Sequence, residues 1–147
     1  LTYCMHIMVR YELEKQLIAG TLAVRDVPEA WNQLYREYLG VEVPNNRMGC
    51  LQDSHWSGGS IGYFPSYALG SAYGPQMLAA MEAEMGSIWE DVAKGDLSKV
   101  KAWLHNHIHR HARLYSPGTL FEMACGKFDA KYYTDYLTEK YTRLYNL

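Results

Sequence analysis

A carboxamide, a carboxylate, an imidazole and an indole lie close together in the middle of this sequence. They belong to Gln52, Asp53, His55 and Trp56. Three glycines follow within a few residues and allow the backbone to turn tightly. Hydrogen-bond donors, acceptors and one titratable ring in so short a stretch are what a catalytic or binding site requires. The stretch from Gly49 to Gly70 is therefore the candidate site.

Two tyrosines, Tyr63 and Tyr67, follow this cluster four residues apart. If a helix begins near Tyr63, the spacing places both phenols on one face, from which they can point back toward the polar cluster. A purely structural interpretation is equally open, because Asp and Ser cap helices, Trp fills cores and paired glycines turn the chain.

A predicted helix over residues 2–19 carries a second set of polar side chains. Its apolar residues recur every four positions, and Gly20 stands where a C-terminal cap belongs. Tyr3, His6 and Arg10 fall along another side of this helix, with Glu14 one turn beyond Arg10. The structural alternative for this side is an exposed polar face with an ion pair between Arg10 and Glu14.

The rest of the sequence also has helical periodicity, so the expected fold class is all-α, with residues 1–147 forming one helical region. A helix after Asp26 is expected to begin with a capping box formed with Glu29 and to end at Gly40. Gly74-Pro75 predicts a kink or a break in the helix that follows Tyr67. Further helices are expected over 87–93, 96–115, 116–124 (closed by Gly126) and 130–144, and no stretch alternates like a strand.

Four histidines alternate with other residues in the second half of the expected 96–115 helix. They are His105, His107, His109 and His111. Residues two apart on a helix point in nearly opposite directions, so only pairs four apart could chelate a metal ion from one face. A pair lacks the ligand count of known sites, and surface or hydrogen-bonded core histidines are the favoured interpretation. We therefore predict no metal ligand in this chain.

Composition excludes several classes of partner. The chain has 147 residues, 48% of them hydrophobic and 20% charged, as in a folded globular protein. A formal net charge of -2 gives no basic stripe, so neither nucleic acid nor a membrane surface is expected as a partner. No apolar run is long enough to span a bilayer, and the three widely spaced cysteines suit reduced thiols. We expect a cytoplasmic protein.

Several motifs together resemble the thermostable (Taq-type) family of zinc-dependent carboxypeptidases. The first is Thr-Tyr-x-x-His-Ile-x-x-Arg-(Tyr/Phe)-Glu-Leu-Glu, matched by residues 2–14. The second is Gly-x-x-Gln-Asp-x-His-Trp, matched in full by residues 49–56. The sequence Ser-Gly-Gly-Ser-x-Gly-Tyr-Phe-Pro-x-Tyr-Ala-Leu-Gly at 57–70 and the segment 108–115 are also similar to that family. The resemblance covers essentially the whole chain, with Pro75 as its main departure.

The resemblance implies a helical, zincin-like metallopeptidase of which this chain is the C-terminal helical portion. Such an enzyme removes C-terminal amino acids from peptides by means of water activated by zinc or another divalent metal. The His-Glu-x-x-His motif that would hold the ion does not occur here, so the metal site is expected outside this chain, and the chain alone is expected to be inactive. The resemblance also implies a homodimer and a peptide substrate with a free C-terminal carboxylate.

The resemblance also suggests roles for individual residues. Arginine suits recognition of a terminal carboxylate, so Arg10 is the candidate for that contact, supported by Tyr3 and His6. His55 or Tyr63 is the candidate donor to the developing oxyanion. The remaining candidates for substrate binding are Gln52, Asp53, Trp56 and Tyr67. We expect Arg10→Ala to weaken activity on free-acid peptides with little change in thermal stability. The alternative function is a non-catalytic helical module that binds a metal or a partner.

Overall fold

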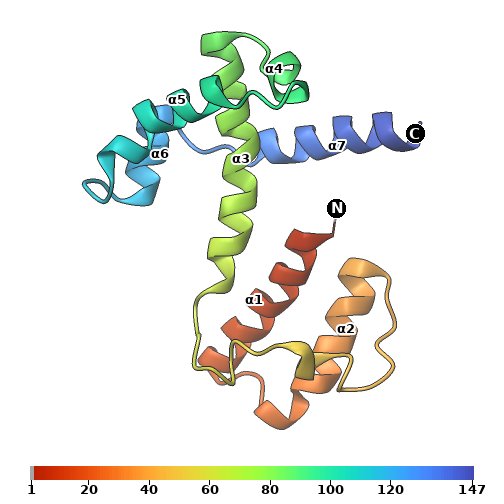
Figure 1. The fold of residues 1–147 in the computed structure, drawn as a ribbon. Coiled ribbons are helices and arrows are strands. Elements are labelled where there is room, and N and C mark those ends of the chain that lie inside the picture. The colour runs from red at the N-terminus through yellow and green to blue at the C-terminus, as the bar shows by residue number, and fades with distance from the viewer. Residues whose placement is uncertain (1) are drawn as a thin grey trace. The chain divides into compact units, whose positions relative to one another are not determined.

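The computed structural model describes residues Thr2–Leu147, which contain helices and connecting segments but no strand (Figure 1). The α-helices are α1 (Tyr3–Ala19), α2 (Val27–Leu39), α3 (Phe64–Met85), α4 (Trp89–Ala93), α5 (Ser98–His107), α6 (Pro117–Cys125) and α7 (Lys131–Tyr145). Short 3₁₀ turns lie at η1 (Val24–Asp26), η2 (Cys50–Gln52) and η3 (His109–His111). The all-α prediction is confirmed for the described residues.

The chain divides into two compact units, Leu1–Gly70 and Ser71–Leu147. The expectation of one helical region within a larger catalytic domain concerns the whole protein and stays a prediction. Among residues Thr2–Leu147, no helix is both long and apolar enough to cross a membrane.

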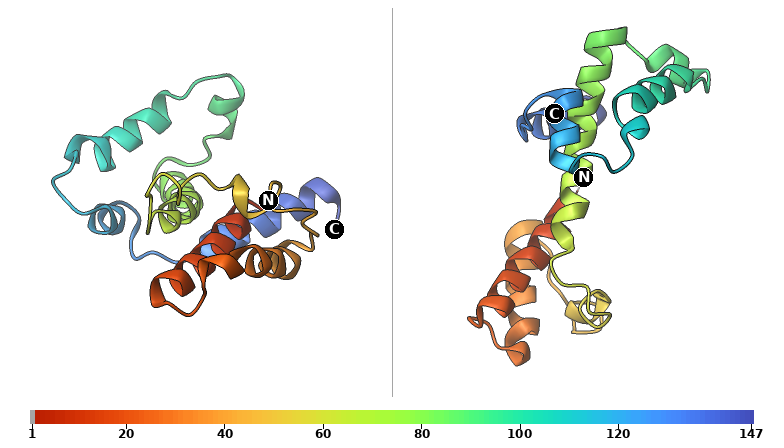
Figure 2. Two further views of the ribbon diagram at one scale, coloured as in Figure 1. Left: turned by 90° about the horizontal axis from the view of Figure 1, so that it is seen from below. Right: turned by 90° about the vertical axis from the view of Figure 1, so that its left-hand side faces the viewer.

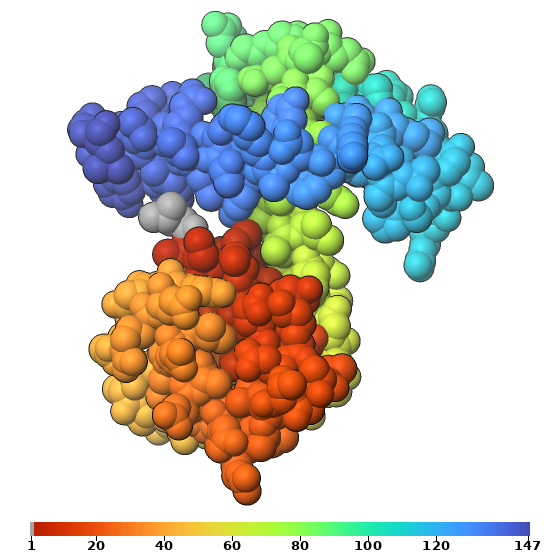
Figure 3. Space-filling view, turned by 180° about the vertical axis from the view of Figure 1, so that it is seen from behind, coloured from red at the N-terminus to blue at the C-terminus, as the bar shows by residue number. Residues whose placement is uncertain are grey.

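Helices α1 and α2 pack side by side in the first unit (Figures 2 and 3). Val9 and Leu13 of α1 meet Trp31 of α2, and all three side chains are fully buried. Both helices end at a glycine in the left-handed conformation, with φ of 71° at Gly20 and 65° at Gly40. The predicted ends of these two helices are confirmed.

The capping box predicted at the start of α2 does not form. Asp26 lies at the end of a 3₁₀ turn with φ -93° and ψ -4°, and its side chain makes no capping hydrogen bond. A capping side chain normally belongs to a residue in the extended conformation, which the preceding turn prevents here. Pro28 does occupy the first turn of α2, as its missing N–H group favours.

Gly49, at the start of the candidate site, is required by close packing. A Cβ atom at this position would lie 2.7 Å from Val43 Cγ1 and 3.3 Å from the carbonyl oxygen of Asn45. The loop before the site therefore folds back on itself so closely that any side chain at this position would displace a neighbour.

The break predicted at Gly74-Pro75 does not occur, because α3 runs through Pro75 as one helix (Figure 1). Proline removes one backbone donor, but packing on both sides of it supports the helix. Tyr73 stacks on Phe121 of α6 with ring centroids 4.0 Å apart. On the other side, Gln76, the residue after Pro75, is 3% exposed and forms hydrogen bonds with backbone groups of the α6–α7 connection.

The predicted helix over 96–115 is shorter than expected. α5 ends at His107, Ile108 leaves the helical conformation with φ -124° and ψ -65°, and a 3₁₀ turn follows. Ala112 then has a positive φ of 47°. The i, i+4 histidine pairs consequently do not share one helical face. The predicted helices near 116–124 and 130–144 are confirmed by α6 and α7, and the Ser116 hydroxyl caps α6.

Candidate functional site

An ion pair between α1 and the loop after η2 forms the centre of the candidate site. The Arg10 Nε donates to Asp53 Oδ2 at 2.8 Å, and one of its terminal N–H groups donates to the carbonyl oxygen of His6 at 2.8 Å. The guanidinium also lies over the Trp31 ring, 4.7 Å from its centroid. The Arg10 side chain is 15% exposed and that of Asp53 is 1% exposed. The structural alternative, an exposed ion pair between Arg10 and Glu14, does not form, because Arg10 pairs with Asp53.

Asp53 also organises the chain around His55. Its Oδ1 accepts the backbone N–H groups of His55 at 2.9 Å and of Trp56 at 3.4 Å, which closes a tight turn on the aspartate side chain. The second oxygen, Oδ2, lies 3.2 Å from His55 Nδ1. A single buried carboxylate therefore fixes both the backbone and the ring of His55.

Opposing effects act on the pKa of the Asp53 carboxyl. Burial raises that pKa, but the hydrogen bonds from Arg10, from the two backbone N–H groups and from His55 together hold it below its usual value of 3.8. Asp53 is consequently a carboxylate at neutral pH. A carboxylate at Nδ1 favours the tautomer in which His55 Nδ1 carries the proton.

The other ring nitrogen of His55 faces the start of α3. Its Nε2 lies 3.4 Å from the Tyr67 hydroxyl. The Tyr63 and Tyr67 rings meet edge to face with centroids 5.0 Å apart, and the Tyr63 ring is stacked at 6.4 Å from His55. Phe64, fully buried, packs against the edge of His55 at 4.9 Å. The prediction that a helix beginning near Tyr63 directs both phenols toward the polar cluster is therefore met.

The Tyr67 hydroxyl stays protonated at neutral pH. Burial raises its pKa above the usual value of 10, and the neighbouring phenols of Tyr63 and Tyr3 raise it further. A phenol in this state is a hydrogen-bond donor, which is the property that a developing negative charge on a substrate requires.

His6 supports the site from the α1 side. Its Nδ1 lies 3.1 Å from the Tyr35 hydroxyl of α2, and its ring meets the edge of the Tyr35 ring. Burial lowers the pKa of His6 below 6.5, and the positive charge of Arg10 lowers it further. A neutral His6 therefore lies beside the arginine, and its backbone carbonyl orients the guanidinium.

Two predicted site residues lie away from this network. The Gln52 side-chain amide donates to the carbonyl oxygen of Arg47 in its own loop. Tyr3 is half exposed and is linked to the site through its electrostatic effect on Tyr67. Trp56 joins the site through its packing, edge to face against both Trp31 and Phe64.

Sequence reasoning missed the part that Glu14 plays. This side chain is 5% exposed and accepts hydrogen bonds from Trp56 Nε1 at 2.9 Å and from the Gly62 N–H at 2.6 Å. Its position one turn after Arg10 suggested a surface ion pair. The signal that could have identified it is its place in the same motif as Tyr3, His6 and Arg10.

No group of three or more His, Cys, Asp or Glu residues within Thr2–Leu147 could hold a metal ion. Among the histidines after Trp103, His107 stacks on Trp103 and pairs with Glu84 at 3.1 Å, and the ring of His111 contacts that of Tyr115. His105 and His109 are exposed. The residues described here therefore do not fit a metal centre.

Comparison with known proteins relates this geometry to a family. A family model described as Carboxypeptidase Taq (M32) metallopeptidase matches residues 1–141. "Carboxypeptidase 1" of Bacillus subtilis is 39% identical over 148 residues, and "Thermostable carboxypeptidase 1" of Thermus thermophilus is 40% identical over 145 residues. These matches cover 100% and 98% of this chain, but only 30% and 28% of the relatives.

Solved structures of the same family have the same fold over this region. The M32 carboxypeptidase from Deinococcus radiodurans R1 superposes with a TM-score of 0.95 at 41% identity, over 100% of this chain and 30% of that one. The Pyrococcus furiosus carboxypeptidase superposes with a TM-score of 0.91 at 37% identity, over 95% of this chain and 28% of that one. The predicted resemblance is confirmed: this chain, which spans about 30% of the length of its relatives, belongs to the carboxypeptidase Taq (M32) family of metallopeptidases.

Proposed function

We propose that this chain is part of a metallocarboxypeptidase that removes C-terminal amino acids from peptides. The observation that carries the proposal is the network of Arg10, Asp53, His55 and Tyr67, built by the two motifs that the chain shares with the family. In this proposal the chain supplies the wall of the substrate cleft. Zinc or another divalent metal is held by residues outside this chain, which alone is inactive.

Tyr63 is the proposed donor to the oxygen that becomes negative when the peptide bond is attacked. If His55 Nδ1 donates to Asp53, the neutral ring has only an acceptor at Nε2, and it donates there only when doubly protonated. The single proton of the Tyr67 hydroxyl is then donated to His55 Nε2, 3.4 Å away, whereas the Tyr63 hydroxyl can donate to the substrate in either state of the ring. Such a donor typically contributes about 3 to 4 kcal/mol to transition-state stabilisation. We therefore assign the direct contact to Tyr63, with His55 acting as an additional donor in its protonated form.

Arg10 remains the proposed contact for the substrate carboxylate. A guanidinium has five N–H groups, and the bonds to Asp53 and to the His6 carbonyl use two of them, so the remaining groups are the ones that a substrate would meet. Tyr3, His6 and Trp56 orient the arginine and close the surface around it. Gln52 and Asp53 position the loop.

The wider expectations belong to this proposal as well. The intact enzyme is a homodimer in the cytoplasm, and its substrates are peptides with a free C-terminal carboxylate. No observation on the described residues favours the alternative of a non-catalytic binding module, so that alternative becomes an outcome of the test.

The test uses the protein produced from its complete coding sequence. We expect it to release single amino acids from free-acid peptides, to spare the matching C-terminal amides, and to lose activity on chelation and regain it with zinc. His55→Gln and Tyr63→Phe should each lower kcat while the metal content stays intact. A protein that binds stoichiometric metal or a partner but hydrolyses neither peptide would support the binding module instead. Loss of metal in His55→Gln would make His55 a structural residue.

A further inference from the structure

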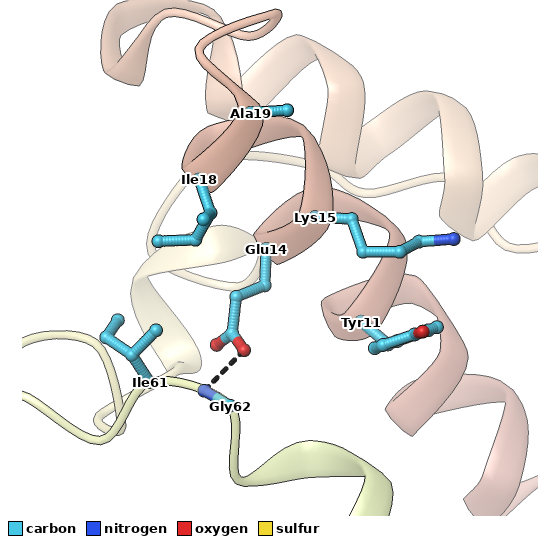
Figure 4. Close-up of a pocket in the computed structure, with 7 residues that line it drawn as sticks. All are labelled: Tyr11, Glu14, Lys15, Ile18, Ala19, Ile61 and Gly62. Carbon is cyan, nitrogen blue, oxygen red and sulfur yellow. Dashed lines mark hydrogen bonds between the residues drawn. The ribbon is translucent and has the colours of Figure 1, made fainter.

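Glu14 is buried, yet it forms no ion pair with any Lys or Arg of the described chain. The nearby cations of α1 have other partners, because Arg10 pairs with Asp53 and Lys15 pairs with Glu12. The Glu14 carboxylate instead uses each oxygen for a different neutral donor, Oε1 for the Gly62 N–H and Oε2 for Trp56 Nε1. Figure 4 shows the side chain reaching from α1 to Gly62 across the groove lined by Tyr11, Lys15, Ile18, Ala19 and Ile61.

The two donors lie at opposite ends of the glycine-rich loop, residues 57–61. Trp56 comes directly before this loop and Gly62 directly after it. The residue before Trp56 is His55, and the residue after Gly62 is Tyr63. Each oxygen of Glu14 therefore holds the immediate neighbour of one proposed catalytic residue.

This loop needs an external anchor. Gly59 and Gly62 both have positive φ, 77° and 75°, which only glycine adopts without strain. The backbone hydrogen bonds of the loop connect only residues close together in the sequence, such as the Gly58 N–H to the Ser54 carbonyl and the Ser60 N–H to the His55 carbonyl. Backbone with so much intrinsic freedom stays in one conformation only if a rigid element binds it, and α1 supplies that element through Glu14.

We propose that Glu14 is a positioning residue, which clamps both ends of the glycine-rich loop and thereby sets the separation of His55 and Tyr63. This inference rests on the proposed function, because it concerns the same two residues. It predicts that the carboxylate acts through its two acceptors rather than through its charge.

The test is a double-mutant cycle in the complete enzyme. Glu14→Gln has one acceptor for two donors, so it should lower kcat at least tenfold, with little change in KM and with intact metal content. Trp56→Phe removes the indole donor and leaves only Gly62, which one carbonyl can satisfy. In the Trp56→Phe background, Glu14→Gln should therefore lower kcat less than threefold. Glu12→Gln, which removes an equal charge from an exposed pair on the same helix, is the control and should leave kcat unchanged.

Equal kcat losses from Glu14→Gln in both backgrounds, or a lower Tm with unchanged kcat, would overturn the inference. Hydrogen exchange of residues 57–63 separates it from the proposed function. Glu14→Ala should speed exchange there and Glu12→Gln should not. If the wild-type enzyme is inactive on peptides but this exchange result holds, the proposed function fails while the clamp stands. If the enzyme is active and exchange is unchanged, the clamp fails alone.

Discussion

Arg10 and Asp53, 43 residues apart in the sequence, form the central ion pair of the site, with Nε and Oδ2 separated by 2.8 Å. The aspartate side chain is almost inaccessible to solvent, and the arginine covers it. The pair therefore joins α1 to the motif of residues 49–56, and we expect both stability and site geometry to depend on it.

Removing Arg10 is expected to leave Asp53 buried without its cation. Arg10→Ala should lower the free energy of unfolding by about 3 kcal/mol, because an uncompensated buried charge is more costly than a lost surface contact. This revises the sequence-based expectation of little change in thermal stability, which did not include a buried partner for Arg10. Arg36→Ala, which breaks the exposed pair with Glu42, is the control for denaturant unfolding. Equal small effects of the two substitutions would contradict the structure.

The Arg10–Asp53 pair should also make the free energy of unfolding depend on pH in the acid range. Because the Asp53 pKa is lower in the folded state than its usual 3.8, the unfolded chain binds more protons in acid. The contribution of Asp53 is therefore fully present above about pH 4 to 5, where the unfolded carboxyl is ionised, and is lost as pH falls through the folded-state pKa.

Unfolding curves between about pH 2.5 and 6 measure this contribution. Asp53→Asn should be less stable than the wild type at the upper end of this range, and the difference should shrink as pH falls. Asp26→Asn, which removes a more exposed carboxylate, is the matched control. A constant difference for Asp53→Asn would show that the ionised carboxylate has no part in the effect.

Local features of this fold could be predicted from the sequence, whereas its long-range pairings could not. Helical periodicity and terminal glycines locate α1 and α2, because those signals act between residues a few positions apart. Periodicity places Arg10 and Glu14 on one side of a helix, where each is the nearest opposite charge to the other. Their real partners lie more than 40 residues away, in a loop whose conformation depends on glycine backbone angles that a helical pattern does not contain.

Gly49 offers a test of close packing at the start of the site motif. Gly49→Ala places a methyl group 2.7 Å from Val43 Cγ1, so we expect a loss of about 1 to 3 kcal/mol in unfolding free energy. Gly70→Ala is the matched control, because that position lies in α3 with open space around it. It should raise stability by about 0.5 to 1 kcal/mol, since alanine favours helix.

A second substitution isolates the Val43 contact. If the clash is the cause, Val43→Ala should relieve part of the penalty of Gly49→Ala, so the two changes together should cost less than the sum of the single changes. Additive costs would instead assign the effect to the carbonyl oxygen of Asn45, which lies 3.3 Å from the added Cβ.

Gln76 holds the second unit together in the same way that Glu14 holds the site loop. Its Nε2 donates to the carbonyl oxygens of Cys125 and Lys127 at 3.1 and 2.9 Å, and its Oε1 accepts from the Asp129 N–H at 3.0 Å. Every polar atom of this buried amide is thus used to fix the connection between α6 and α7 on α3.

Gln76→Glu keeps the shape of the side chain but replaces two donors with an acceptor that faces two carbonyl oxygens. We expect a loss of about 3 kcal/mol in unfolding free energy, because one oxygen of the buried carboxylate and both carbonyl oxygens would lack donors. Hydrogen exchange across residues 125–130 should accelerate. The loss should shrink in acid, because the protonated carboxyl of the variant can donate one hydrogen bond to a carbonyl oxygen. Gln33→Glu, on the exposed side of α2, is the control. A loss of unfolding free energy at Gln76 no larger than at Gln33 would show that Gln76 does not fix the α6–α7 connection.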